Sequence, residues 1–98
     1  NGQPKQYSGY CTDVWFAEAS RFIRASHGES APFFCYLAPN VVHGPMLVAD
    51  EYFLRYRDVE GVFSVNAAKM YGMVANLDEN MGRLMNCSSP SRLSVIRF

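Results

Sequence analysis

The chain has 98 residues, of which 49% are hydrophobic, 14% aromatic and 18% charged. This composition is too apolar for intrinsic disorder, and the length allows one domain at most. Nine basic residues balance nine acidic ones in mixed order, which excludes the basic footprint of a protein that binds nucleic acid or an anionic membrane. No apolar run reaches the length that a bilayer span requires.

Three cysteines, Cys11, Cys35 and Cys87, are candidates for covalent or metal chemistry. Their number is odd and none belongs to a CxxC pair, so the sequence indicates neither a disulfide framework nor a zinc site. Cys35 lies in an apolar run and is predicted to be a small core residue. The first residue is Asn1 and not methionine, so we expect a fragment of a longer protein.

The stretch TDVWFAEASRFIRASHG, residues 12–28, predicts an amphipathic helix. Thr12 or Asp13 can cap its first turn, and Gly28 can adopt the left-handed conformation that ends a helix. The apolar residues expected on its buried face are Phe16, Ala19, Phe22 and Ile23. We interpret His27, beside this glycine, as a partner of the helix dipole and not as a ligand.

Residues 32–38, PFFCYLA, form a nearly continuous apolar run without alternation. Such a run is typical of a parallel strand that is covered on both faces. A helix followed by a buried strand predicts the α/β class. The strand also needs neighbours for its backbone hydrogen bonds, and residues 93–98 are the other stretch with a suitable composition.

The loop PNVVHGP, residues 39–45, places His43 after the predicted strand. Ligands bind outside the carboxyl ends of strands in open α/β sheets, so this position favours a functional histidine. An imidazole there can hold an anionic oxygen or donate a proton. The alternative is an ordinary loop histidine that is bonded to the backbone.

Two further helices are predicted beyond this loop. Residues 48–58 favour a short helix, and its partly packed aromatic residues would be Tyr52, Phe53 and Tyr56. Residues 66–85 predict a long helix that is capped by Asn66. Its apolar stripe would consist of Met70, Val74, Leu77, Met81 and Leu84. Glu79 and Arg83 lie four residues apart and can form an ion pair on the exposed side.

Three segments, GYCTDVWFAEASRFI, PFFCYLAPNVVHGP and YGMVANLDENMGRL, resemble in order and approximate spacing the sulfatase family of the alkaline phosphatase-like superfamily. The most specific of them is the apolar strand that ends in a His-x-Pro loop. The last segment adds Leu77, Asp78, Gly82 and Arg83. The resemblance implies a fragment of an alkaline phosphatase-like α/β domain, with a partial sulfatase domain over residues 9–85 and a divergent tail over residues 86–98.

By this resemblance, His43 is the catalytic-site histidine that contacts the sulfate group of a sulfate ester near its leaving oxygen, as a hydrogen-bond or proton donor. Members of the family also use calcium and a formylglycine made within a Cys/Ser-x-Pro-Ser-Arg motif. The calcium ligands and the nucleophile segment of the family have no counterpart here, and we interpret Asp78 as structural. We therefore expect a sulfuric ester hydrolase as the parent enzyme and no turnover by this chain alone.

The tail contains one apparent match to the nucleophile motif. Ser88 to Arg92 read Ser-Ser-Pro-Ser-Arg. This match follows the last predicted helix, whereas the family places its motif far upstream of the GYCTD segment. We interpret the similarity as a coincidence in a serine-rich tail, so the chain has no credible formylglycine site.

Two other functions remain open from the sequence. The chain can be a small non-catalytic protein that forms oligomers or docks on a partner through residues 33–37 and its apolar helix faces. It can also be a piece of a related phosphodiesterase or phosphonate hydrolase, since these enzymes share the architecture. The identity of the parent's nucleophile would distinguish the ester classes.

Overall fold

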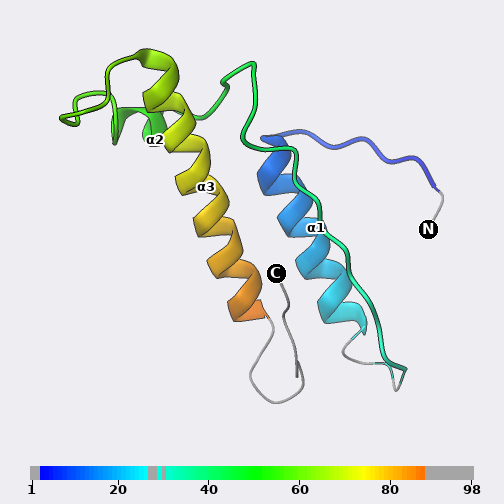
Figure 1. Cartoon of the computed structure of the whole chain (residues 1–98). Coiled ribbons are helices and arrows are strands. Elements are labelled where there is room, and N and C mark those ends of the chain that lie inside the picture. Colours follow the sequence, from blue (N-terminus) through cyan, green and yellow to red (C-terminus); the bar gives the residue numbers. More distant parts are fainter. Residues whose placement is uncertain (1–2, 27–28, 30, 88–98) are drawn as a thin grey trace.

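The computed structural model describes residues 3–26, 29 and 31–87. These residues form the helices α1 (Cys11–Ser26), α2 (Asp50–Leu54) and α3 (Val65–Cys87), and none of them lies in a β-strand (Figure 1). The predicted α/β fold with a buried parallel strand is therefore wrong, because the described chain is helical. Residues 93–98, the predicted pairing partner, lie outside the described residues.

Helices α1 and α3 pack side by side and run in the same direction (Figure 1). Near the start of α1, Asp13 accepts a hydrogen bond from Asn80, which is 67 residues further along the chain. Near its end, the backbone oxygen of Ser20 accepts one from Cys87, again across 67 residues. A constant separation between contacting residues is the signature of a parallel pair, since the separation would change along an antiparallel one.

The face of α1 that meets α3 is close to the one that the sequence predicts. Phe16, Ala19 and Ile23 are buried there, but Phe22 remains 43% exposed. The helix begins one residue before the predicted cap Thr12, which is itself buried. Glu18 of α1 accepts a hydrogen bond from the Tyr7 hydroxyl at 2.8 Å. This contact holds the N-terminal residues against the helix.

Helix α3 begins at Val65, and Ser64 serves as its cap in place of the predicted Asn66. The Ser64 hydroxyl accepts the amide N–H of Ala67 at 3.0 Å, which satisfies one of the free donors in the first turn. The predicted apolar stripe is also displaced, since Met70 and Val74 are 37% and 47% exposed. The residues buried in α3 are Ala68, Gly72, Met73, Asn76 and Asn80.

Helix α2 is short and lies against α3 (Figure 1). Its buried residue is Tyr52, whose backbone passes so close to Gly72 that a Cβ there would stand 3.1 Å from the Tyr52 carbonyl. Glycine at this point lets the two backbones approach, and a larger residue would require Tyr52 to shift by a few tenths of an ångström. The rings of Tyr56 and Tyr71 extend the contact, with their centroids 5.9 Å apart.

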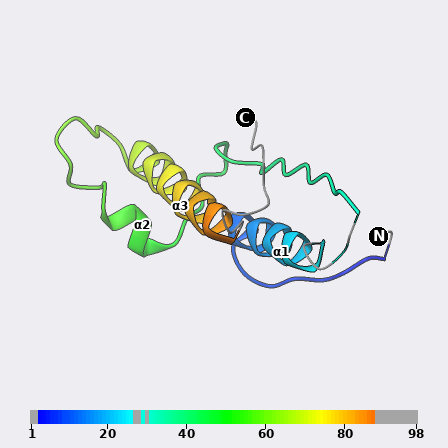
Figure 2. The same cartoon turned by 90° about the horizontal axis from the view of Figure 1, so that it is seen from below.

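Residues 32–38 are extended but not buried. They run along α1, and Figure 2 shows α1 between them and the N-terminal residues. Phe34 is 85% exposed and Tyr36 is 81% exposed. Cys35 is also exposed and not the core residue that its apolar surroundings predict.

The structure is elongated, with principal extents of 51 × 32 × 19 Å. Its radius of gyration is 16.1 Å, against about 13 Å for a compact domain of about 100 residues. The core is accordingly small and is shared between the α1–α3 and α2–α3 interfaces. None of the described helices has the length and hydropathy needed to cross a membrane.

Candidate functional site

The loop that carries His43 connects the extended segment to α2. His43, Gly44 and Pro45 are all exposed. The Nδ1 atom of His43 lies 2.7 Å from the Gly44 carbonyl oxygen. A carbonyl oxygen only accepts hydrogen bonds, so Nδ1 is the protonated donor. This contact fixes the tautomer and leaves Nε2 as the nitrogen available to a ligand.

The protonation state of the ring decides what Nε2 can do. In the neutral imidazole with hydrogen on Nδ1, Nε2 is an acceptor and can take a proton. In the imidazolium both nitrogens are donors, so an anionic oxygen can be held while the Gly44 contact is kept. Anion binding at this ring therefore requires its protonated form.

One contact ties the loop to the helical body. Asn40 lies three residues before His43, and its side-chain oxygen accepts a hydrogen bond from the Cys11 thiol at 3.5 Å. Cys11 is the first residue of α1. Thiols are weak donors, so the contact contributes little stability. It shows that the start of the loop lies beside the N-terminus of α1.

The residues around His43 do not fit the calcium site of the sulfatase family. Calcium takes about six to eight oxygen ligands, many of them carboxylates. No group of three or more His, Cys, Asp or Glu residues is placed to hold a metal ion in residues 3–26, 29 and 31–87. Asp78 is exposed on α3. Ser88 to Arg92 and His27 lie outside the described residues, so their interpretations are not addressed by the structure.

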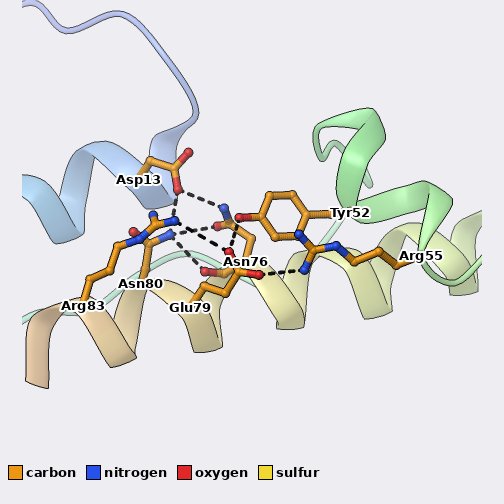
Figure 3. Close-up of polar contacts among 7 residues, drawn as sticks. All are labelled: Asp13, Tyr52, Arg55, Asn76, Glu79, Asn80 and Arg83. Carbon is orange, nitrogen blue, oxygen red and sulfur yellow. Dashed lines mark hydrogen bonds and ion pairs between the residues drawn. The ribbon is translucent and has the colours of Figure 1, made fainter. Parts of the chain in front are cut away.

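A buried polar cluster lies between α1 and α3 (Figure 3). One carboxylate oxygen of Asp13 accepts hydrogen bonds from the side-chain amides of Asn76 at 2.9 Å and Asn80 at 2.7 Å. Asn76 is 1% exposed and Asn80 is 3% exposed. Asn80 also donates to the backbone oxygen of Asn76 at 2.9 Å. These contacts satisfy polar groups that would otherwise be costly to bury, so the cluster is structural.

A second polar cluster joins α2 to α3 around Glu79 (Figure 3). Arg55 donates to one carboxylate oxygen at 2.6 Å, and the Tyr52 hydroxyl donates to the other at 2.7 Å. The predicted partner Arg83 is also present, at 3.7 Å, which confirms the expected ion pair. The guanidinium of Arg55 lies 4.6 Å from the centre of the Tyr52 ring. The carboxylate thus receives contacts from both helices.

These contacts shift the pKa values of the groups that make them. The pKa of Glu79 is lowered from its ordinary value, first by the hydrogen bond from Arg55 and then by the one from Tyr52. The pKa of Tyr52 is raised, mainly because the bond to Glu79 stabilises the neutral phenol. The two shifts favour the ionised acid and the neutral phenol, the protonation states in which Tyr52 donates to Glu79.

The structure does not bring the residues predicted from sequence into one site. Within the described residues, no hydrogen bond or ion pair joins His43 to either polar cluster. Asn76 and Asn80 were not predicted from the sequence, although a signal for them exists. Two amides four residues apart lie on the same face of a helix and can share one acceptor on a neighbouring helix.

Comparisons with known proteins do not assign this arrangement. No protein-family model matches the sequence, and no solved structure matches the fold. The sulfatase resemblance therefore stands on the three sequence segments described above.

Proposed function

We propose that this chain supplies the histidine loop of a sulfatase-type sulfuric ester hydrolase, with His43 in contact with the sulfate group. The observation that carries the proposal is the resemblance of three segments to the sulfatase family, with His43 in the most specific of them. In the structure the ring is exposed and its Nδ1 is bonded to the Gly44 carbonyl oxygen, the contact that the alternative of an ordinary loop histidine also expects.

The role of His43 follows from the chemistry of sulfate ester cleavage. When the sulfur–oxygen bond breaks, the leaving oxygen becomes an anion that a protonated imidazole can neutralise by donating a hydrogen bond or a proton. His43 would act at that oxygen through Nε2, while Gly44 holds the other nitrogen. The substrate class is accordingly an ester of sulfuric acid.

One histidine does not complete the reaction. In the family that the chain resembles, formylglycine provides the nucleophile and calcium neutralises the sulfate oxygens. Residues 3–26, 29 and 31–87 contain no group of three or more His, Cys, Asp or Glu side chains placed to hold a metal ion. None of Cys11, Cys35 and Cys87 is followed by x-Pro-Ser-Arg. We therefore propose that the chain alone is inactive and contacts sulfate without cleaving its ester.

The test separates binding from turnover. Inorganic sulfate is titrated into the isotopically labelled chain, and the ring resonances of His43 are followed by NMR at acidic and alkaline pH. We expect a saturable shift at acidic pH that is weaker at alkaline pH, since anion binding requires the imidazolium. His27 serves as the reference ring in the same spectra.

Two outcomes contradict the proposal. If the His43 resonances do not respond to sulfate while the chain remains folded, the ring is an ordinary loop histidine. If the purified chain releases sulfate from an aryl sulfate and His43→Ala abolishes the release, the chain holds a complete active site. A parallel titration with phosphate tests the related phosphodiesterase alternative, for which phosphate would displace sulfate.

A further inference from the structure

The extended segment 33–38 is unevenly covered. Phe33 and Leu37 are partly covered, and Phe33 meets Phe22 of α1 edge-to-face with ring centroids 5.7 Å apart. Phe34 and Tyr36 lie between them in sequence and are 85% and 81% exposed. Cys35, between these two rings, is exposed as well. Phe33 therefore lies against α1, and the middle of the segment presents two aromatic rings to solvent.

The backbone of this segment is extended but makes no sheet. No backbone–backbone hydrogen bond involves residues 33–38 within the described part of the chain. Pro32 and Pro39 bound the segment, and neither has an N–H to donate. The N–H and C=O groups between the two prolines therefore form a short edge that is able to pair with another extended strand.

Charge does not oppose pairing of this edge with a second copy of the chain. Residues 31–49 contain no Asp, Glu, Lys or Arg, and the whole chain has a formal net charge of +0. A second copy of this segment would bring no like charge against the first. A chain without net charge also lacks the long-range repulsion that keeps copies apart.

We propose that residues 33–37 pair with the same residues of a second copy of this chain, as antiparallel strands about a twofold axis at Cys35. In an antiparallel pair with twofold symmetry, the axis is perpendicular to the sheet and one residue lies opposite its own copy. Cys35 is the residue midway between Phe33 and Leu37. Phe34 then lies opposite the partner's Tyr36, so the exposed rings form two cross-strand aromatic pairs.

This pairing is antiparallel and joins two chains along an exposed edge. The strand predicted from composition was parallel and buried within one chain. It also does not depend on the sulfate contact of His43, which lies beyond Pro39. Sulfate titration and self-association are separate measurements, so failure of one proposal leaves the other standing.

Cys35 provides a direct test of the register. Residues opposite one another in antiparallel strands have Cα atoms about 4.5–5.5 Å apart, within the range that a disulfide spans. We expect the Cys11→Ser/Cys87→Ser variant to form a covalent dimer when a mild oxidant removes two electrons and two protons from the paired thiols. The matched Cys35→Ser variant, which keeps Cys11 and Cys87, should give no such dimer.

Charge exchange at the same position tests the pairing without oxidation. Cys35 is exposed, so a charged side chain there does not disturb the core. Cys35→Lys should weaken the dimer about fivefold in sedimentation equilibrium, because two like charges face each other. Mixing Cys35→Lys with Cys35→Glu should restore association, and Cys35→Ser should leave it unchanged.

The proposal is overturned if the chain sediments as a monomer at every concentration tested. It is equally overturned if a dimer forms and Cys35→Lys leaves its affinity unchanged. Oxidation that joins two copies through Cys11 or Cys87 and not through Cys35 would also overturn it. If the natural partner of this edge has a different sequence, the isolated chain would sediment as a monomer.

Discussion

The Tyr52 hydroxyl donates a hydrogen bond of 2.7 Å to Glu79 and connects α2 to the middle of α3. Arg55 reaches the same carboxylate from the next turn of the chain. Helix α2 spans the five residues Asp50–Leu54, too few to be stable by itself. Its place against α3 therefore depends on these polar contacts and on the close approach of Tyr52 to Gly72.

We expect Tyr52→Phe to lower the melting temperature, because it removes the donor while keeping the buried ring. Glu79→Gln should have a larger effect, since it weakens the contacts with both Tyr52 and Arg55. Thermal unfolding of the two variants and of the double variant measures the coupling. The double variant should lose less than the sum of the single losses, and simple additivity would show that the bond contributes nothing.

Stability should fall in acid through the Glu79 cluster. The pKa of Glu79 is lowered below its ordinary value of 4.5, so the folded state favours the carboxylate. The contribution is complete above that value and is lost as the pH falls through the folded-state pKa. Urea unfolding at a series of pH values should show the difference between the native chain and Glu79→Gln shrinking in acid. A constant difference would contradict this account.

The same cluster predicts a loss of stability in strong alkali. The pKa of Tyr52 is raised above its ordinary value of 10.0, so the folded state favours the neutral phenol. That contribution is complete below the ordinary value and is lost as the pH rises through the folded-state pKa. The pKa values of Tyr7, Tyr10 and Tyr52 are all raised. Spectroscopic titration of tyrosinate absorbance should therefore show a late-titrating group of phenols, and Tyr52→Phe should remove one phenol from it.

Two glycines of α3 provide a matched pair of substitutions. A Cβ at Gly82 would meet nothing within 4 Å, so Gly82→Ala should stabilise the chain by about 1 kcal/mol through helix propensity. A Cβ at Gly72 would stand 3.1 Å from the backbone of Tyr52. Gly72→Ala should therefore destabilise the chain, because α2 must move away. Urea unfolding measures both, and equal gains at the two positions would disprove the close approach.

The buried cluster between α1 and α3 predicts a large effect at Asp13. Asp13→Ala leaves the amides of Asn76 and Asn80 without their shared acceptor, at a cost of about 1–3 kcal/mol. Asp13→Asn keeps an acceptor oxygen and should retain most of the stability. The control is Asp78→Ala on the exposed side of α3, which should change the unfolding free energy by less than about 0.5 kcal/mol.

The extended segment shows why composition alone predicted the wrong fold class. PFFCYLA has the residues of a buried strand, but burial depends on surfaces that other segments contribute. In the described chain, the ring contact recorded for Phe33 is with Phe22, while Phe34 and Tyr36 face solvent. A hydrophobic side chain gains free energy when it is buried, but its hydrophobicity does not specify which segment buries it.

The stripe of α3 shows a second limit. Apolar periodicity selected Met70 and Val74, yet the buried face contains Asn76 and Asn80. An asparagine counts as polar in any pattern, but it can be buried once its amide is bonded to a partner such as Asp13. The partner lies on another helix, so local patterning does not detect it.

The sequence by itself determined where the long helices lie, because propensity, periodicity and turn residues act over short distances. It also identified the Glu79–Arg83 pair, which one helix turn imposes, and the exposed loop that carries His43. The tertiary structure decided which face of α3 is buried and that Arg55 and Tyr52 approach Glu79 more closely than Arg83 does. It also decided that Phe34 and Tyr36 remain exposed. These outcomes depend on contacts between segments far apart in the chain, where the gain from burial and hydrogen bonding is set by the partner and not by local sequence.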